Sequence, residues 1–144
     1  MSDATELPPS IHEKITALCA EGDRLSGDLM FEEAVASYNT AWQLVPDPKT
    51  NWNASTWILA AIGDACFLGG FRTSAREALE YAMHCPGGVG NPLLHLRLGQ
   101  VLYDEGDHDR AADELARAYM GAGGEIFADL DARYFDFLRT RISI

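Results

Sequence analysis

Hydrophobic residues recur every three or four positions along most of the chain, which is the spacing of one face of an α-helix. Segments rich in Gly, Pro, Asn and Asp interrupt this pattern and predict turns. The pattern predicts three antiparallel helix pairs followed by one further helix. The expected helices span residues 11–27, 31–45, 54–69, 72–84, 92–105, 108–121 and 125–141. An all-α fold is therefore expected.

The last predicted helix has one strongly apolar face. The residues of that face are Phe127, Leu130, Tyr134, Phe137 and Leu138. A stack of helix pairs needs a terminal element that covers its exposed apolar end. Residues 125–141 are therefore expected to form a C-terminal capping helix, which favours a monomer for the free protein.

The N-terminal end is expected to be simple. Residues 1–10 are predicted to be a flexible N-terminus, and residues 11–144 a single domain. Ser10 is expected to cap the first helix through its side chain, with Glu13 completing a capping box.

Small residues recur at matching points of the three helix pairs. In the clearest copy, Gly99 permits close packing of the first helix, Gly106-Asp107 reverses the chain, and Ala111 lies where the two helices cross. The equivalent residues upstream are Gly63, Gly70 and Ala75 in the second copy, and Gly22 and Ala34 in the first. Residues 47–53, which are rich in turn formers, lengthen the connection between the first two copies.

This pattern resembles the tetratricopeptide repeat (TPR) family, whose unit is about 34 residues long. The resemblance covers about residues 15–124, with repeats at about 15–46, 56–87 and 92–124. The chain departs from the family in three ways: Glu21 replaces an apolar residue, Phe71 replaces the usual Asp, and the family's early Trp is replaced by Leu18, Leu59 and His95. The resemblance implies a right-handed superhelical solenoid of three helix pairs with a C-terminal cap.

The chain is strongly acidic, with a formal net charge of -11. Residues 1–50 alone carry nine acidic and three basic side chains. Such a chain repels nucleic acid and anionic membranes and favours a basic partner. The alternative is that the acidity serves only solubility.

Membrane insertion and secretion are not expected. No apolar run is long enough to span a membrane, and the N-terminus lacks a secretory signal, so a cytoplasmic location is predicted. Cys19, Cys66 and Cys85 lack the spacing of a zinc site, and their odd number argues against a disulfide framework. They are interpreted as small buried hydrophobic residues.

The sequence carries no pattern typical of a catalytic, phosphate-binding or metal site. The glycine-rich stretch 87–90 lacks the Gly-Lys-Ser/Thr ending of a phosphate loop and is interpreted as a turn. The four histidines lack metal-ligand spacing, and His95 is predicted to be a core residue with satisfied hydrogen bonds. We therefore expect no catalytic residue, no cofactor and no metal.

The resemblance also implies where a partner binds, because the first helix of each pair lines the concave face of a TPR array. The partner-binding residues implied in this way are Asp23, Trp57, Asp64, Phe67, Leu96, Gln100, Tyr103 and Asp104. Together they would form an aromatic and aliphatic strip edged by carboxylates. The alternative is that some of them pack against the cap helix or against residues 47–53. The basic clamp of TPR proteins that bind chaperone C-termini is absent, which excludes that subfamily.

Three functions remain open. Residues 91–100 and 118–123 resemble short bacterial TPR proteins of the toxin-immunity type, which favours an acidic partner that neutralises a basic toxin. The first alternative is a chaperone of a type III-like secretion system. The second is a general TPR adaptor or scaffold. All three are non-enzymatic protein binders.

Overall fold

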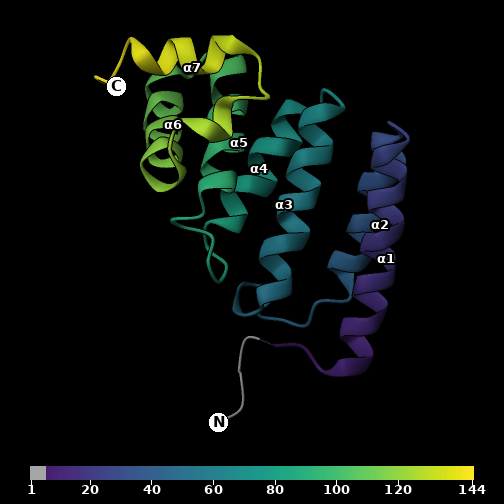
Figure 1. The fold of residues 1–144 in the computed structure, drawn as a ribbon. Coiled ribbons are helices and arrows are strands. Elements are labelled where there is room, and N and C mark those ends of the chain that lie inside the picture. The colour runs from purple at the N-terminus through teal and green to yellow at the C-terminus, as the bar shows by residue number, and fades with distance from the viewer. Residues whose placement is uncertain (1–5) are drawn as a thin grey trace. The chain divides into compact units, whose positions relative to one another are not determined.

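A computed structural model describes residues 6–144, and within that range the chain contains α-helices and short 3-10 helices but no strand (Figure 1). The helices are α1 (Pro9–Gly27), α2 (Phe31–Gln43), η1 (Lys49–Asn51), α3 (Asn53–Leu68), α4 (Arg72–Ala82), α5 (Pro92–Asp104), α6 (His108–Ala122), η2 (Gly124–Phe127) and α7 (Ala132–Arg139). The predicted all-α class is confirmed. The first six α-helices agree with the predicted spans to within two residues at each end.

The chain divides into two compact units, Met1–Gly88 and Val89–Ile144. Unit 1 contains α1 to α4, and unit 2 contains α5 to α7. The expected single domain over residues 11–144 stays a prediction.

The start of α1 differs from the expectation. The helix begins at Pro9, its N-cap is Pro8, and no side chain caps it, so the predicted capping box of Ser10 and Glu13 was wrong. Proline is well suited to the first helical position because its fixed φ matches the helix and it has no N–H to satisfy. Ahead of the helix, Leu7 is buried. The flexible N-terminus predicted for residues 1–10 therefore does not extend to residue 10, because Leu7 is buried and residues 9 and 10 are helical. Residues 1–5 lie outside the described range.

Each helix pair packs through a glycine of its first helix. The contacts are Gly22 with Tyr38, Gly63 with Leu79, and Gly99 with Leu115. A Cβ atom at any of the three glycines would come within 2.4–2.7 Å of the facing side chain, closer than non-bonded atoms approach. The alanines predicted at the helix crossings, Ala34, Ala75 and Ala111, are fully buried. The three pairs are therefore closed by the same small-residue contacts.

The turns inside the three pairs also share one geometry. The turn residues with positive φ are Leu29 (63°), Gly70 (87°) and Gly106 (86°). The N–H of the next residue then donates back to the first helix, from Met30 to Leu25 O at 2.9 Å, from Phe71 to Cys66 O at 2.7 Å and from Asp107 to Leu102 O at 2.9 Å. This is the Schellman-type closure that usually requires glycine, and Leu29 is the exception among the three.

The predicted cap helix over 125–141 is broken into η2 and α7. Asp131 interrupts it because its carboxylate accepts a hydrogen bond from the backbone N–H of Arg133 at 3.0 Å and starts a new helix. After the break, η2 and α7 both pack against the antiparallel pair α5 and α6, which we call the α5–α6 hairpin. There Phe127 and Leu138 join Leu115 in one buried cluster. In unit 2, α7 lies across the ends of α5 and α6 (Figure 1).

Candidate functional site

Three helices of unit 1 enclose a groove of about 280 Å³ that we call the α1–α3 groove. Its lining residues are Asp23, Ser26, Tyr38, Ala61, Asp64, Ala65 and Leu68. Asp23 comes from α1 and Asp64 from α3, and both side chains are exposed. The structure therefore brings two of the predicted partner-binding residues into one groove.

The carboxylate of Asp23 is held by a buried phenol. The hydroxyl of Tyr38 donates to Asp23 Oδ1 at 2.6 Å, and Tyr38 is only 3% exposed. Burial, together with the hydrogen bond to Asp23, raises the pKa of Tyr38 to about 12. The phenol therefore keeps its proton at neutral pH and fixes the orientation of the carboxylate.

Exposed apolar side chains lie on the same face of α3 as Asp64. Trp57, Asp64 and Leu68 are separated by seven and four residues, which places them along one side of a helix. Leu68 is 55% exposed and Trp57 is 38% exposed. The Trp57 ring meets His12 of α1 edge to face, with 6.4 Å between ring centroids. The face of α3 that carries Asp64 therefore combines charge with apolar area.

Sequence reasoning missed Leu68 as a candidate. The available signal was its four-residue spacing from Asp64, which assigns both residues to one helix face.

Phe67 of α3 and Leu96 of α5 are placed differently from Asp23 and Asp64. Phe67 of α3 is half-buried and does not line the groove. Leu96 is buried in unit 2, where it joins the cluster of Leu115, Phe127 and Leu138. The exposed strip expected to include Leu96 is therefore contradicted, because η2 and α7 fold over that side of the hairpin.

Gln100 is also internal. It is 2% exposed, and its side-chain oxygen accepts a hydrogen bond from Arg97 Nη1 at 3.2 Å. The exposed groove position expected for Gln100 is therefore contradicted by its burial.

Tyr103 and Asp104 are engaged by the C-terminal segment. The hydroxyl of Tyr134 lies 3.0 and 2.9 Å from the two carboxylate oxygens of Asp104. Arg133 Nη2 also donates to the Asp104 carboxylate, at 3.1 Å from Oδ1. The Tyr103 ring packs against Phe137 with 4.9 Å between centroids. This is the alternative that the sequence left open, in which candidate residues pack against the cap.

The three cysteines are free and buried, as predicted. Burial, with a smaller contribution from Asp23, raises the pKa of the Cys19 thiol to about 11. Burial also raises the pKa of Cys66 and of Cys85. All three thiols are therefore protonated at neutral pH, which makes them poor nucleophiles.

His95 is a core residue, as predicted. It is 4% exposed, and its Nε2 accepts a hydrogen bond from the backbone N–H of Gly90 at 2.9 Å. Its Nδ1 lies 2.6 Å from Glu114 Oε1, so Nδ1 carries the proton that is donated to the carboxylate. His95 thereby ties the connection before α5 to the second helix of the hairpin.

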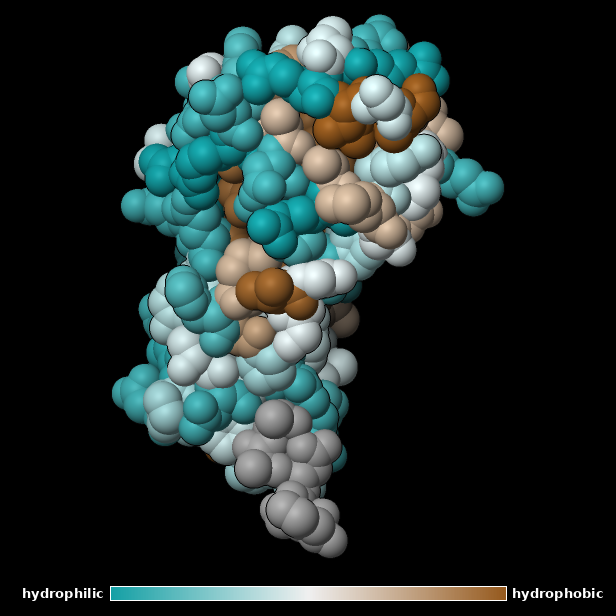
Figure 2. All heavy atoms as spheres, turned by 90° about the vertical axis from the view of Figure 1, so that its left-hand side faces the viewer, coloured by the Kyte–Doolittle hydropathy of each residue, from teal (hydrophilic) through white to brown (hydrophobic). Residues whose placement is uncertain are grey.

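Within residues 6–144, no group of three or more His, Cys, Asp or Glu side chains is arranged to hold a metal ion. In the same range, no helix combines the length and apolar character needed to cross a membrane. On the face drawn in Figure 2, hydrophobic residues form small separate patches among hydrophilic ones. No protein-family model matches the chain, and no curated protein matches it either.

Proposed function

We propose that this protein is a non-enzymatic binding module that holds a basic polypeptide in the α1–α3 groove. The observation that carries the proposal is the pair of exposed carboxylates, Asp23 and Asp64, which come from different helices and line one groove beside Leu68. The shared glycine contacts and turns of the helix pairs support a TPR-like repeat architecture. The right-handed solenoid and the cytoplasmic location are part of the same proposal.

Charge and apolar area have different roles in this groove. Exposed ion pairs contribute about 0–1 kcal/mol each, so Asp23 and Asp64 alone do not give a tight complex. Aromatic and other apolar anchors contribute more, often above about 1 kcal/mol each. We therefore assign the apolar contact inside the groove to Leu68, and the selection of Lys or Arg side chains to the two carboxylates. Trp57 does not line the groove, and it can add a contact only to a partner that extends along the same face of α3.

The proposed partner is a basic bacterial toxin that the protein neutralises. The net charge of -11 supports this choice, because opposite charge accelerates association and an immunity partner must act before its toxin does. Secretion chaperones and adaptors share the same groove chemistry, and they differ in what they bind. The identity of the partner therefore separates the three functions.

The test is co-expression with the product of the neighbouring gene. We expect the protein to restore growth, and the double variant Asp23→Asn with Asp64→Asn to lose at least about tenfold in affinity for that product. The matched control is Glu13→Gln with Glu33→Gln, which removes the same charge from exposed positions of α1 and α2 outside the groove. The control should stay within about twofold of the wild type.

Each other outcome has a defined meaning. Equal losses in both double variants would show that only net charge matters, and no loss in either would remove the groove as the binding site. A harmless neighbouring product would contradict the neutralising role. Selective binding to the unfolded N-terminal segment of an exported protein would favour the secretion chaperone instead.

A further inference from the structure

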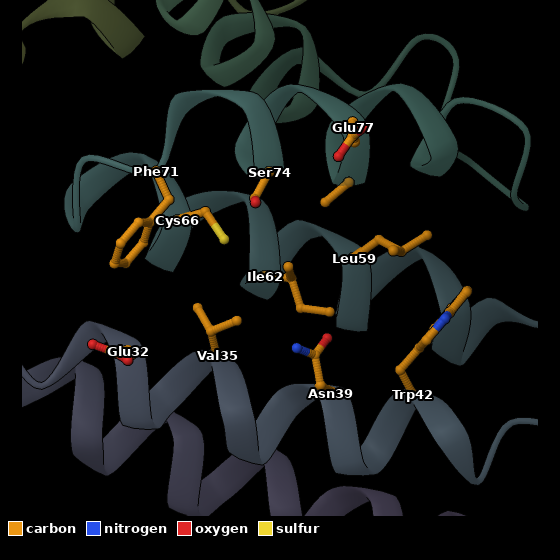
Figure 3. Close-up of a pocket in the computed structure, with 11 residues that line it drawn as sticks. Glu32, Val35, Asn39, Trp42, Leu59, Ile62, Cys66, Phe71, Ser74 and Glu77 are labelled. Carbon is orange, nitrogen blue, oxygen red and sulfur yellow. The ribbon is translucent and has the colours of Figure 1, made fainter.

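A second and larger cleft lies between α2, α3 and α4 of unit 1, with a volume of about 450 Å³ (Figure 3). We propose that this cleft, the α2–α4 cleft, is a separate docking site for a polypeptide segment in which an apolar side chain neighbours a Lys or Arg. The site lies on a different face of α3 from the α1–α3 groove. It goes beyond the proposed function, which concerns the other groove alone.

The floor of the α2–α4 cleft is apolar. Val35 and Ile62 point into the space between the helices, with Leu59 and Cys66 on either side (Figure 3). Leu59, Ile62 and Cys66 are each less than 9% exposed, so they present only small apolar surfaces to the cleft. A Leu, Met or Phe side chain entering the cleft would be removed from water against this floor.

The rim of the cleft is acidic. Glu32 of α2 and Glu77 of α4 lie on opposite walls, and both are exposed (Figure 3). Among the described residues that line the cleft, none is basic. Lys49 lies near the Trp42 end of the cleft, and its ammonium donates to the carbonyls of Trp42 and Val45. The charge that complements this rim is therefore positive.

Phe71 adds an exposed aromatic ring to the cleft. Met30, Phe71 and Asp107 are the N-caps of α2, α4 and α6 and share one backbone conformation, with φ of -95°, -93° and -86° and ψ of 67°, 74° and 75°. Only Asp107 uses its side chain to cap the helix. Phe71 gives up that stabilisation and leaves a 43% exposed ring at one end of the cleft. The ring offers an aromatic surface against which an incoming apolar side chain can pack.

A second copy of this chain is a poorer occupant. Each copy carries a net charge of -11, so an acidic cleft would receive a strongly acidic molecule. A basic polypeptide from another protein satisfies both the rim and the floor. The experiment below includes self-association as an outcome.

The test selects displayed random short peptides on the wild-type protein. We expect enriched peptides to carry Leu, Ile, Met or Phe within two positions of Lys or Arg. Phe71→Asn should weaken those peptides by about tenfold while the thermal midpoint stays the same or rises, because Asn is a good N-cap. Met30→Asn makes the same change at the equivalent position outside the cleft, and it should leave peptide affinity unchanged.

The charge arm uses Glu32→Gln with Glu77→Gln, compared with Glu13→Gln with Glu33→Gln. The first pair should weaken the enriched peptides by about tenfold and the second by no more than about twofold. Enrichment of peptides without a cation or without an apolar residue would overturn the proposal. So would equal affinity for wild-type and Phe71→Asn proteins.

Two further outcomes separate this site from the alternatives. If Asp23→Asn with Asp64→Asn abolishes peptide binding and Phe71→Asn does not, the peptides occupy the α1–α3 groove. The second site then fails while the proposed function stands. If sedimentation shows a dimer that Phe71→Asn dissociates, the cleft is a self-association surface and the foreign partner is ruled out.

Discussion

Leu29 adopts a backbone conformation that leucine rarely adopts. Its φ of 63° matches the positive φ of Gly70 and Gly106 at the equivalent turns, yet it carries a side chain that is 75% exposed. A non-glycine residue in this region lowers the free energy of unfolding by about 1–2 kcal/mol. The exposed side chain of Leu29 buries little apolar area that could offset this loss. Leu29 is thus a locally unfavourable choice at an otherwise regular turn.

We predict that Leu29→Gly raises the free energy of unfolding by about 0.5–1 kcal/mol, because relief of the backbone strain exceeds the entropy cost of glycine. Urea unfolding measures the change. The reciprocal control is Gly70→Ala, where φ is 87° and no atom lies within 4 Å of the added Cβ, so strain alone should destabilise the protein. A less stable Leu29→Gly variant would show that the leucine side chain makes a contact that outweighs the strain.

Tyr38 gives a prediction at alkaline pH. Its pKa is raised from 10.0 to about 12, so the folded state holds the phenol proton more tightly than the unfolded state does. The resulting stabilisation is complete below pH 10 and is lost as pH rises to about 12. Tyr38→Phe should remove this part of the alkaline loss and should cost about 1 kcal/mol at neutral pH through the missing hydrogen bond.

The measurement is the free energy of unfolding as a function of pH, made in a Cys19→Ala background. That background removes the thiol whose pKa of about 11 falls in the same window. Parallel curves for the proteins with Tyr38 and with Phe at this position would contradict the assignment.

The helix pair is the element that the sequence specifies most completely. Gly22 packs its Cα face against the Tyr38 ring, whereas nothing lies within 4 Å of a Cβ added at Gly27 on the same helix. Gly22→Ala should therefore lower the free energy of unfolding by about 1–3 kcal/mol, through overpacking against a rigid ring. Gly27→Ala should be neutral or stabilising by up to about 1 kcal/mol. Chemical denaturation of the two variants tests both signs, and similar effects would show that close packing at Gly22 is not required.

Local demands explain which elements were predictable. Glycine contacts, turn glycines and fully buried alanines leave few alternatives along the sequence, so the helix pairs were predicted closely. The cap helix was not, because the capping carboxylate of Asp131 competes with the apolar periodicity that runs through 125–141. The apolar periodicity indicates which side chains share one face of a helix, but it does not predict where a capping residue ends one helix and begins another.

The candidate site was also predicted only in part. Asp23 and Asp64 were expected as groove residues because the TPR resemblance implies those positions, and both line the α1–α3 groove. Leu96 was misplaced because its burial depends on where η2 and α7 fold, which no local pattern encodes. The α2–α4 cleft escaped prediction for a similar reason, since its walls come from three helices.

The net charge belongs to the molecule rather than to any one site. With a net charge of -11, long-range attraction should dominate the encounter with a basic partner. We predict that raising NaCl from about 0.05 M to about 0.5 M slows association at least about tenfold while dissociation changes little. Stopped-flow kinetics with the identified partner measures both rates, and a salt-independent association rate would contradict electrostatic steering.

The shared turn and glycine contact of the three helix pairs also bear on how such a chain can lengthen. Each pair contains its own turn and its own glycine contact between the two helices. An in-frame duplication of one pair would therefore add a segment that can fold into a further antiparallel pair. The residue after the turn, which is the N-cap of the second helix, can then vary. It is Met30, Phe71 and Asp107 in the three pairs. New binding surfaces can arise in this architecture at the cost of one helix cap.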